Sequence, residues 1–125
     1  MTRSPFAAMI GATLERDDDG PVVAMPFGEA VVGRPGFLHG GAIGGLLELA
    51  ARATLREGMA DAPAPVRLVT MTSDYRRGGR ERATHAAARV TRLGNRVANV
   101  EASAWQEERD RPIATARFTF AILRD

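Results

Sequence analysis

The chain has 125 residues, and its 45% apolar and 26% charged residues are typical of a folded globular domain rather than a disordered segment. The absence of cysteine excludes disulfides, thiolate catalysis and cysteine-based metal sites, and two histidines are too few for a histidine-rich metal site. All 17 basic residues are arginine, but the net charge is only +2, which gives no argument for a nucleic-acid partner. We predict a single domain over residues 1–125 with no metal.

The N-terminal segment predicts a short helix rather than a targeting signal. Ser4-Pro5 is typical of an N-cap followed by the first helical position, so we expect a helix that begins at Pro5 and ends at Gly11. The segment has no long apolar core with a cleavage site, and no stretch approaches the roughly 18 consecutive apolar residues of a membrane span. We therefore expect no membrane partner and a cytoplasmic location.

A β-hairpin is predicted next. Residues 12–17 and 21–27 have strand patterns, and Asp17-Asp18-Asp19-Gly20 between them is a strong turn signal. The aspartate run lacks the further ligands of a calcium loop, so we interpret it as a turn. Residues 28–38 are rich in glycine and proline and are predicted to form a loop.

One long helix is predicted from about Gly41 to Glu57, with Gly58 as its C-cap. Apolar residues recur there at helical spacing over a broad surface, which indicates a mostly buried helix. That surface consists of Ile43, Leu46, Leu47, Leu49, Ala50, Ala53 and Thr54.

The remainder of the chain predicts strands only. Apolar and polar residues alternate with a period of two, which favours antiparallel strands with one buried face. The connections at Gly78-Gly79, Gly94-Asn95 and Glu108–Pro112 are short enough for hairpins. The predicted strands span residues 66–76, 82–93, 96–106 and 113–123.

These elements predict an α+β domain in which a curved antiparallel sheet of about six strands wraps around the long helix. Two layers of this kind bury both the apolar helix surface and the apolar sheet face. Alanine prevails at the inward positions of the late strands, and such small side chains would let the helix lie close to the sheet.

Four glycines lie at the start of the long helix and need an explanation, since each costs up to about 1 kcal/mol inside a helix. For Gly44 and Gly45, close packing against the sheet or another helix is one reason. For Gly40 and Gly41 we favour a second reason. The first helical turn has unpaired N–H groups, and glycine leaves them open to a ligand, as in an oxyanion hole made from backbone.

Glu48 is the one acid in an otherwise apolar run of this helix. It could form an ordinary i, i+4 ion pair with Arg52 on an exposed edge, worth a few tenths of a kcal/mol. It could also be a carboxylate held in a cleft, where it would attack an electrophile or activate water. The spacing alone leaves both interpretations open.

The distance between Gly40 and Glu48 has a consequence for any shared site. Eight residues of helix span about 12 Å, whereas catalytic contacts are about 3 Å long. One helix cannot bring both groups to one carbonyl, but two antiparallel copies could. Joint catalysis by these residues therefore predicts a two-fold dimer with its sites at the interface.

The segment Leu38-His39-Gly40-Gly41, followed by an acid nine residues after the histidine, resembles the signature of hotdog-fold acyl-CoA thioesterases of the PaaI-like and 4-hydroxybenzoyl-CoA thioesterase groups. The resemblance extends over nearly the whole chain. It includes Asp74-Tyr75-Arg76-Arg77, Arg92-Leu93-Gly94-Asn95-Arg96 and the strand from Pro112 to Phe120.

The resemblance implies a role for each residue of the motif. Glu48 would be the nucleophile or general base, the Gly40 N–H would polarise the thioester carbonyl, and His39 would shape the site, with Gly41 beside it. Relatives often place a serine or threonine on the next strand facing the acid, for which Thr70 and Thr72 are the candidates. The sequence departs from the pattern at Gly33, where relatives carry asparagine or glutamine.

The resemblance also implies an acyl-CoA substrate, no separate cofactor and assembly as a homodimer or a dimer of dimers. The phosphates of CoA would need a basic rim, for which we select Arg76, Asn95 and Arg96. A solvated arginine surface is the alternative for each of them. Because of Gly33, a non-catalytic protein that binds acyl-CoA or an aromatic ligand is the competing functional hypothesis.

Overall fold

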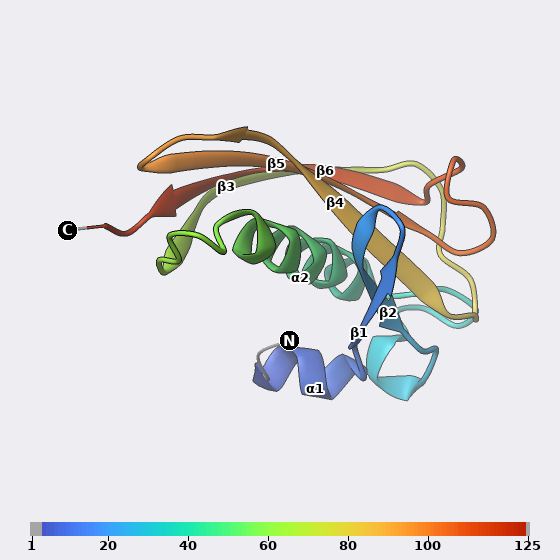
Figure 1. Ribbon diagram of the computed structural model, residues 1–125. Coiled ribbons are helices and arrows are strands. Elements are labelled where there is room, and N and C mark those ends of the chain that lie inside the picture. The colour runs from blue at the N-terminus through green and yellow to red at the C-terminus, as the bar shows by residue number, and fades with distance from the viewer. Residues whose placement is uncertain (1–3, 125) are drawn as a thin grey trace.

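The computed structural model describes residues 4–124 and contains two α-helices, one 3-10 turn and six strands (Figure 1). In chain order these are α1 (Pro5–Ile10), β1 (Thr13–Asp17), β2 (Gly20–Met25), η1 (Glu29–Val31), α2 (Gly40–Gly58), β3 (Val66–Tyr75), β4 (Thr84–Leu93), β5 (Val97–Trp105) and β6 (Ala114–Ile122).

The six strands form one antiparallel sheet in the order β1-β2-β4-β5-β6-β3. Figure 1 shows α2 in the concave face of this curved sheet, with α1 on the far side of α2. The predicted α+β class and the six-stranded curved sheet are confirmed. The prediction of a hairpin at Gly78-Gly79 is wrong, because β3 pairs with β6 while β4 lies between β2 and β5.

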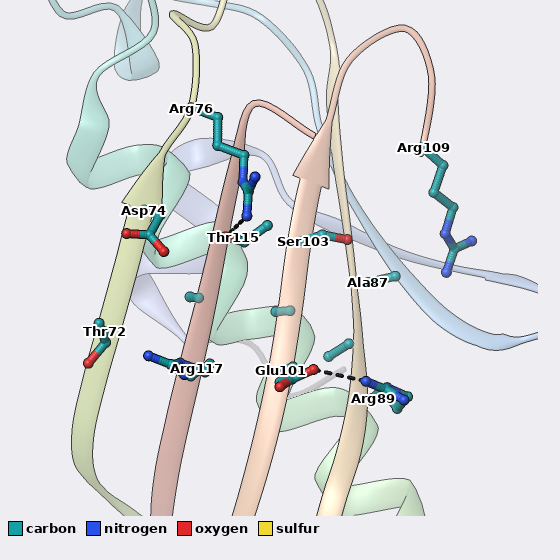
Figure 2. Close-up of a pocket in the computed structure, with 13 residues that line it drawn as sticks. Thr72, Asp74, Arg76, Ala87, Arg89, Glu101, Ser103, Arg109, Thr115 and Arg117 are labelled. Carbon is teal, nitrogen blue, oxygen red and sulfur yellow. Dashed lines mark hydrogen bonds and ion pairs between the residues drawn. The ribbon is translucent and has the colours of Figure 1, made fainter. Parts of the chain in front are cut away.

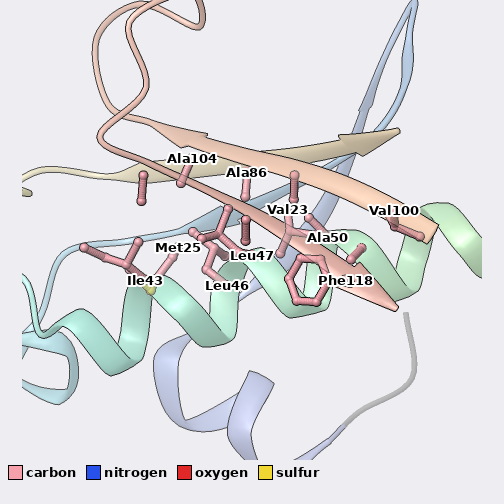
Figure 3. Close-up of a cluster of buried hydrophobic side chains, with 14 of the residues drawn as sticks. Val23, Met25, Ile43, Leu46, Leu47, Ala50, Ala86, Val100, Ala104 and Phe118 are labelled. Atoms are coloured by element: carbon pink, nitrogen blue, oxygen red, sulfur yellow. The ribbon is translucent and has the colours of Figure 1, made fainter. Parts of the chain in front are cut away.

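The core lies between α2 and the sheet, as the alternation predicts. The inward positions of β5 are Ala98, Val100, Ala102 and Ala104, all at most 5% exposed. Figure 3 shows leucines of α2 directed at small residues of this kind on the strands. Each leucine buried in this way stabilises the fold by about 1.5–3 kcal/mol, so this contact fixes the position of α2 on the sheet.

The ends of both helices follow from local chemistry. Ser4 caps α1 by accepting a 3.0 Å hydrogen bond from the Ala7 N–H, and Gly11 ends it in the left-handed conformation, with φ of 70°. The long helix extends one residue further at each end than predicted, so that Gly58 is its last residue rather than its C-cap. Within residues 4–124, no helix is long and apolar enough to cross a membrane.

Candidate active site

His39 determines how α2 begins. Its backbone is extended, with φ of −69° and ψ of 129°, and its Nδ1 accepts a 2.9 Å hydrogen bond from the Gly41 N–H. A Cβ atom at Gly41 would lie 3.0 Å from the imidazole, so a larger residue there would push the ring away. His39 therefore acts as the N-cap of the helix, and Gly41 leaves room for that cap.

The Gly40 peptide is held in place and its N–H is open. Among the described residues, no acceptor takes a hydrogen bond from the Gly40 N–H, while the Gly40 carbonyl accepts one of 2.8 Å from the Tyr75 hydroxyl. Gly40 is exposed, and the positive end of the helix dipole lies at this point. The first turn of α2 thus offers a fixed backbone donor to an incoming oxygen atom.

Glu48 lies in a cleft of about 780 Å³ that α2 forms with α1 and β3. Its Oε2 atom also accepts a 2.8 Å hydrogen bond from Arg52 Nε, and each side chain is 31% exposed. Both interpretations of Glu48 are therefore present together: the carboxylate has the ordinary i, i+4 partner and it lines a cleft. Arg56, one turn beyond Arg52, lines the same cleft.

The wall that faces Glu48 comes from β3, but not from the threonines selected above. A register shift between Leu68 and Thr70 sets which side chains of β3 point inward, and Met71, Ser73 and Tyr75 line the cleft. Thr70 and Thr72 lie on the opposite face of the sheet, among the polar residues of β5 and β6. The expectation that one of them faces the acid is thus corrected, because Ser73 lines the cleft with Glu48 and neither threonine does.

Arg76, Asn95 and Arg96 do not meet at this cleft within one chain. Arg76 follows β3 and lies on the outer face of the sheet, where Figure 2 shows it beside Thr115 and above Arg117. Asn95 and Arg96 form the β4–β5 turn, at the end of the sheet that covers the C-terminal part of α2 (Figure 1). The basic residues that do line the Glu48 cleft, Arg52 and Arg56, were not selected as substrate contacts.

The outer face carries a second cleft, of about 550 Å³, with a mixed charge pattern (Figure 2). Arg89 and Glu101 form a 2.9 Å ion pair across β4 and β5, and Arg117 follows Glu101 on β6. Alternating charges of this kind satisfy one another across neighbouring strands. The cleft lies on the face of the sheet away from α2, and its lining has an excess of arginine, with Arg76, Arg89, Arg109 and Arg117 against Asp74 and Glu101.

Gly33 packs closely against the backbone of His39, which leaves little space for a side chain. A Cβ atom there would lie 3.1 Å from the His39 Cα, and the Gly33 N–H donates a 3.0 Å hydrogen bond to the Phe37 carbonyl. The guanidinium of Arg34 lies 4.1 Å from the centre of the Phe37 ring. Arg34, the neighbour of Gly33, is therefore in cation–π contact with Phe37.

Phe6 is a cleft residue that the sequence interpretation missed. The outer edge of its ring occupies the space beside Gly45, where a Cβ atom would lie 2.2 Å from the ring. Close packing of Gly45 against another helix, one of the two reasons considered for these glycines, is thereby confirmed. The sequence signal was the Gly44-Gly45 pair itself, but nothing in the local pattern identifies α1 as its partner.

The arrangement around Glu48 offers an acid–base group and backbone donors, with apolar walls. Within residues 4–124, no three histidine, aspartate or glutamate side chains gather in a way that could hold a metal ion. A long helix wrapped by a curved antiparallel sheet is the arrangement of the hotdog fold.

Comparison with known families gives the assignment. Residues 31–121 match the model of the acyl-CoA thioesterase N-terminal domain, and the chain belongs to this family. The search among curated proteins found no match.

Solved structures agree with this fold. A Chromobacterium violaceum protein is 31% identical, with a TM-score of 0.75, over 96% of this chain and 84% of its own. A Bacillus halodurans protein crystallised with CoA is 20% identical, with a TM-score of 0.87, over 98% of this chain and 81% of its own. A putative thioesterase from Ralstonia eutropha, described as related to phenylacetic acid degradation, is 20% identical, with a TM-score of 0.83, over 97% and 92%.

Proposed function

We propose that the protein hydrolyses acyl-CoA thioesters as a homodimer, with Glu48 as the acid–base or nucleophilic group and the Gly40 N–H as oxyanion donor. The observation that carries this proposal is the position of Glu48 in a cleft bordered by the start of α2 and by β3. The family assignment supports a thioester substrate, and the CoA bound to the Bacillus halodurans protein supports CoA as its carrier.

The open edge of the sheet supports the dimer. Within residues 4–124, β3 pairs only with β6, so its other edge carries unpaired N–H and C=O groups over up to ten residues. Val69 and Tyr75 on this strand are 55% and 51% exposed. An edge of this kind is a template for pairing with a second copy of itself. Two-fold pairing there would lay two α2 helices side by side and antiparallel, with Gly40 of one chain near Glu48 of the other.

The chemistry then needs only groups of the two chains and water. The Glu48 carboxylate either attacks the thioester carbonyl carbon directly or takes a proton from a water molecule that attacks it. The carbonyl oxygen becomes an oxyanion that the Gly40 N–H stabilises, and its collapse breaks the C–S bond. CoA leaves as a thiolate, which takes up the proton that Glu48 removed from water. Where Glu48 attacks directly, water then hydrolyses the anhydride between the acyl group and Glu48, which frees the carboxylate and supplies that proton. We expect no further cofactor, no nucleic-acid partner and a cytoplasmic location.

Glu48→Gln tests this proposal most directly. The amide keeps the size and can still bond Arg52, but it cannot act as base or nucleophile, so turnover should fall by a factor of about 100 or more. Thiol release from short-chain, long-chain and aryl CoA esters would be measured.

Glu57→Gln is the matched control, because Glu57 lies on the same helix and pairs with an arginine, yet lies outside the cleft. This variant should retain turnover. Undiminished thiol release by Glu48→Gln would contradict the proposal.

A non-catalytic acyl-CoA binding protein is the second candidate. Two observations favour it: Arg52 forms an ion pair with the Glu48 carboxylate, and Gly33 has no side chain at the position where the resemblance implies an amide. Such a protein would bind CoA esters tightly without releasing thiol. Calorimetric binding measured beside the thiol assay distinguishes the two functions.

A further inference from the structure

The floor of the Glu48 cleft is built from residues one helical turn apart. Gly45 precedes Glu48 by three residues, and Arg52 and Arg56 follow it by four and eight, so all four lie along one strip of α2. The strip therefore has a glycine end without side chains and an arginine end with two cations.

Aromatic and apolar side chains stand over the glycine end of the strip. The Phe6 ring lies on Gly45, while the Tyr75 hydroxyl lies 3.1 Å and the Met71 Cε 3.7 Å from where a Cβ atom at Gly44 would be. Phe6 comes from α1 and the other two from β3, so the walls rise on two sides of the glycine pair. Phe6 and Met71 make this end mainly apolar, with the Tyr75 hydroxyl as a polar group, whereas the arginine end carries the charge.

Phe6 borders this end of the cleft from α1, a helix that other residues hold in place. Ala7 and Ile10 of α1 are 2% and 3% exposed and pack into the core, and Ser4 caps the helix. Phe6 itself is only partly buried, with the outer edge of its ring in contact with Gly45 and the remainder bordering the cleft. The ring thus packs against the core on one side and lines the cleft on another.

We propose that Phe6 limits the size of the acyl group, so that the cleft accepts compact acyl or aryl groups and excludes long chains. The polar, phosphate-bearing CoA suits the arginine end, and the acyl group suits the apolar end that Phe6 closes. A chain that extends past this wall meets the aromatic ring, and a mismatch of this kind in an apolar pocket costs about tenfold or more. The inference rests on the proposed function only in taking an acyl-CoA as the ligand.

The test uses binding of CoA thioethers, which cannot be hydrolysed, so it does not depend on catalysis by Glu48. Dissociation constants for S-butyl-, S-benzyl- and S-hexadecyl-CoA would be measured by calorimetry. The unaltered protein should bind the first two more tightly than the third. Phe6→Ala should improve hexadecyl binding relative to butyl binding by at least about tenfold, and Phe6→Leu should shift the ratio less in the same direction.

Met9→Ala is the control, because Met9 lies on α1 but is 60% exposed and does not line the cleft. It should leave the ratio unchanged. An unchanged ratio in folded Phe6→Ala and Phe6→Leu proteins would overturn the inference. A shifted ratio without thiol release from the matching thioesters would support it while contradicting the proposed hydrolysis.

Discussion

At the scale of single residues, the glycines of α2 serve different purposes. Gly41 leaves room for the His39 imidazole, whereas Gly45 leaves room for the Phe6 ring. Gly58 has no such reason, since a Cβ atom there would meet Val90 at an ordinary 3.8 Å. The same substitution to alanine should therefore have different effects along one helix.

We expect Gly58→Ala to raise the free energy of unfolding by up to about 1 kcal/mol, because alanine is the better helix former. Gly41→Ala has the same propensity gain, but its methyl group displaces His39 and removes the N-cap bond, a loss of about 1 kcal/mol. The two effects cancel, so this variant should be no more stable than the parent. Urea unfolding of both proteins measures the difference. Equal stabilisation at the two positions would show that the His39 cap contributes nothing.

At the scale of elements, the sequence predicts the helices and strands because each has its own periodicity. The alanines of β5 face the core where the alternation places them, and Glu48 lies in a cleft on the helix whose start the His-Gly-Gly motif indicates. The order of the strands could not be predicted in the same way. The pairing of β3 with β6 joins residues about 50 apart in the chain, and a local pattern does not indicate which distant strand is the partner.

The selection of Thr70 and Thr72, where Ser73 lines the cleft instead, shows how far the site could be predicted. Successive residues of a strand point to opposite faces, so one shift in register exchanges the whole set. The shift between Leu68 and Thr70 has no glycine or proline to indicate it in the sequence. Phe6 could not be identified for a related reason, since its contact with Gly45 depends on how two helices pack.

Two exposed ion pairs join the β1–β2 hairpin to other parts of the protein, in addition to the pairing of β2 with β4. Arg16 of β1 makes hydrogen bonds of 2.6 and 2.9 Å to the Glu57 carboxylate at the end of α2, which lowers the pKa of Glu57. The pKa of Asp17 is also lowered, first by the Asp19 N–H and then by Arg109. In the folded protein both carboxyl groups therefore resist protonation.

A lowered carboxyl pKa stabilises the fold fully above the unfolded value of about 4 and loses that contribution as the pH falls through the folded value. The Asp17→Asn/Glu57→Gln double variant lacks this contribution. Its stability deficit relative to the parent should be present near neutral pH and shrink as the pH falls below about 4. Urea midpoints over this range measure it. Glu15→Gln on the same strand is the control, and a deficit independent of pH would contradict the assignment.

At the scale of the whole molecule, the proposed site depends on two chains, and this can be tested without a structure of the dimer. Gly40→Pro removes the proposed oxyanion donor while leaving the helix start intact. Proline is favoured at the first helical position, and the extended His39 backbone suits a residue before proline. A Cβ atom at Gly40 would meet Tyr75 at an ordinary 3.8 Å.

Glu48→Gln and Gly40→Pro homodimers should each be inactive, but their mixture should not be. After the chains exchange, each heterodimer holds one damaged site and one intact site, which combines Gly40 of one chain with Glu48 of the other. Random exchange of equal amounts makes half of the dimers mixed, so about a quarter of the parental thioesterase activity should return. Sites contained within one chain would stay inactive in every mixture. Recovery of activity on mixing, measured by thiol release after mild denaturation and refolding together, thus decides whether the partner chain completes the site.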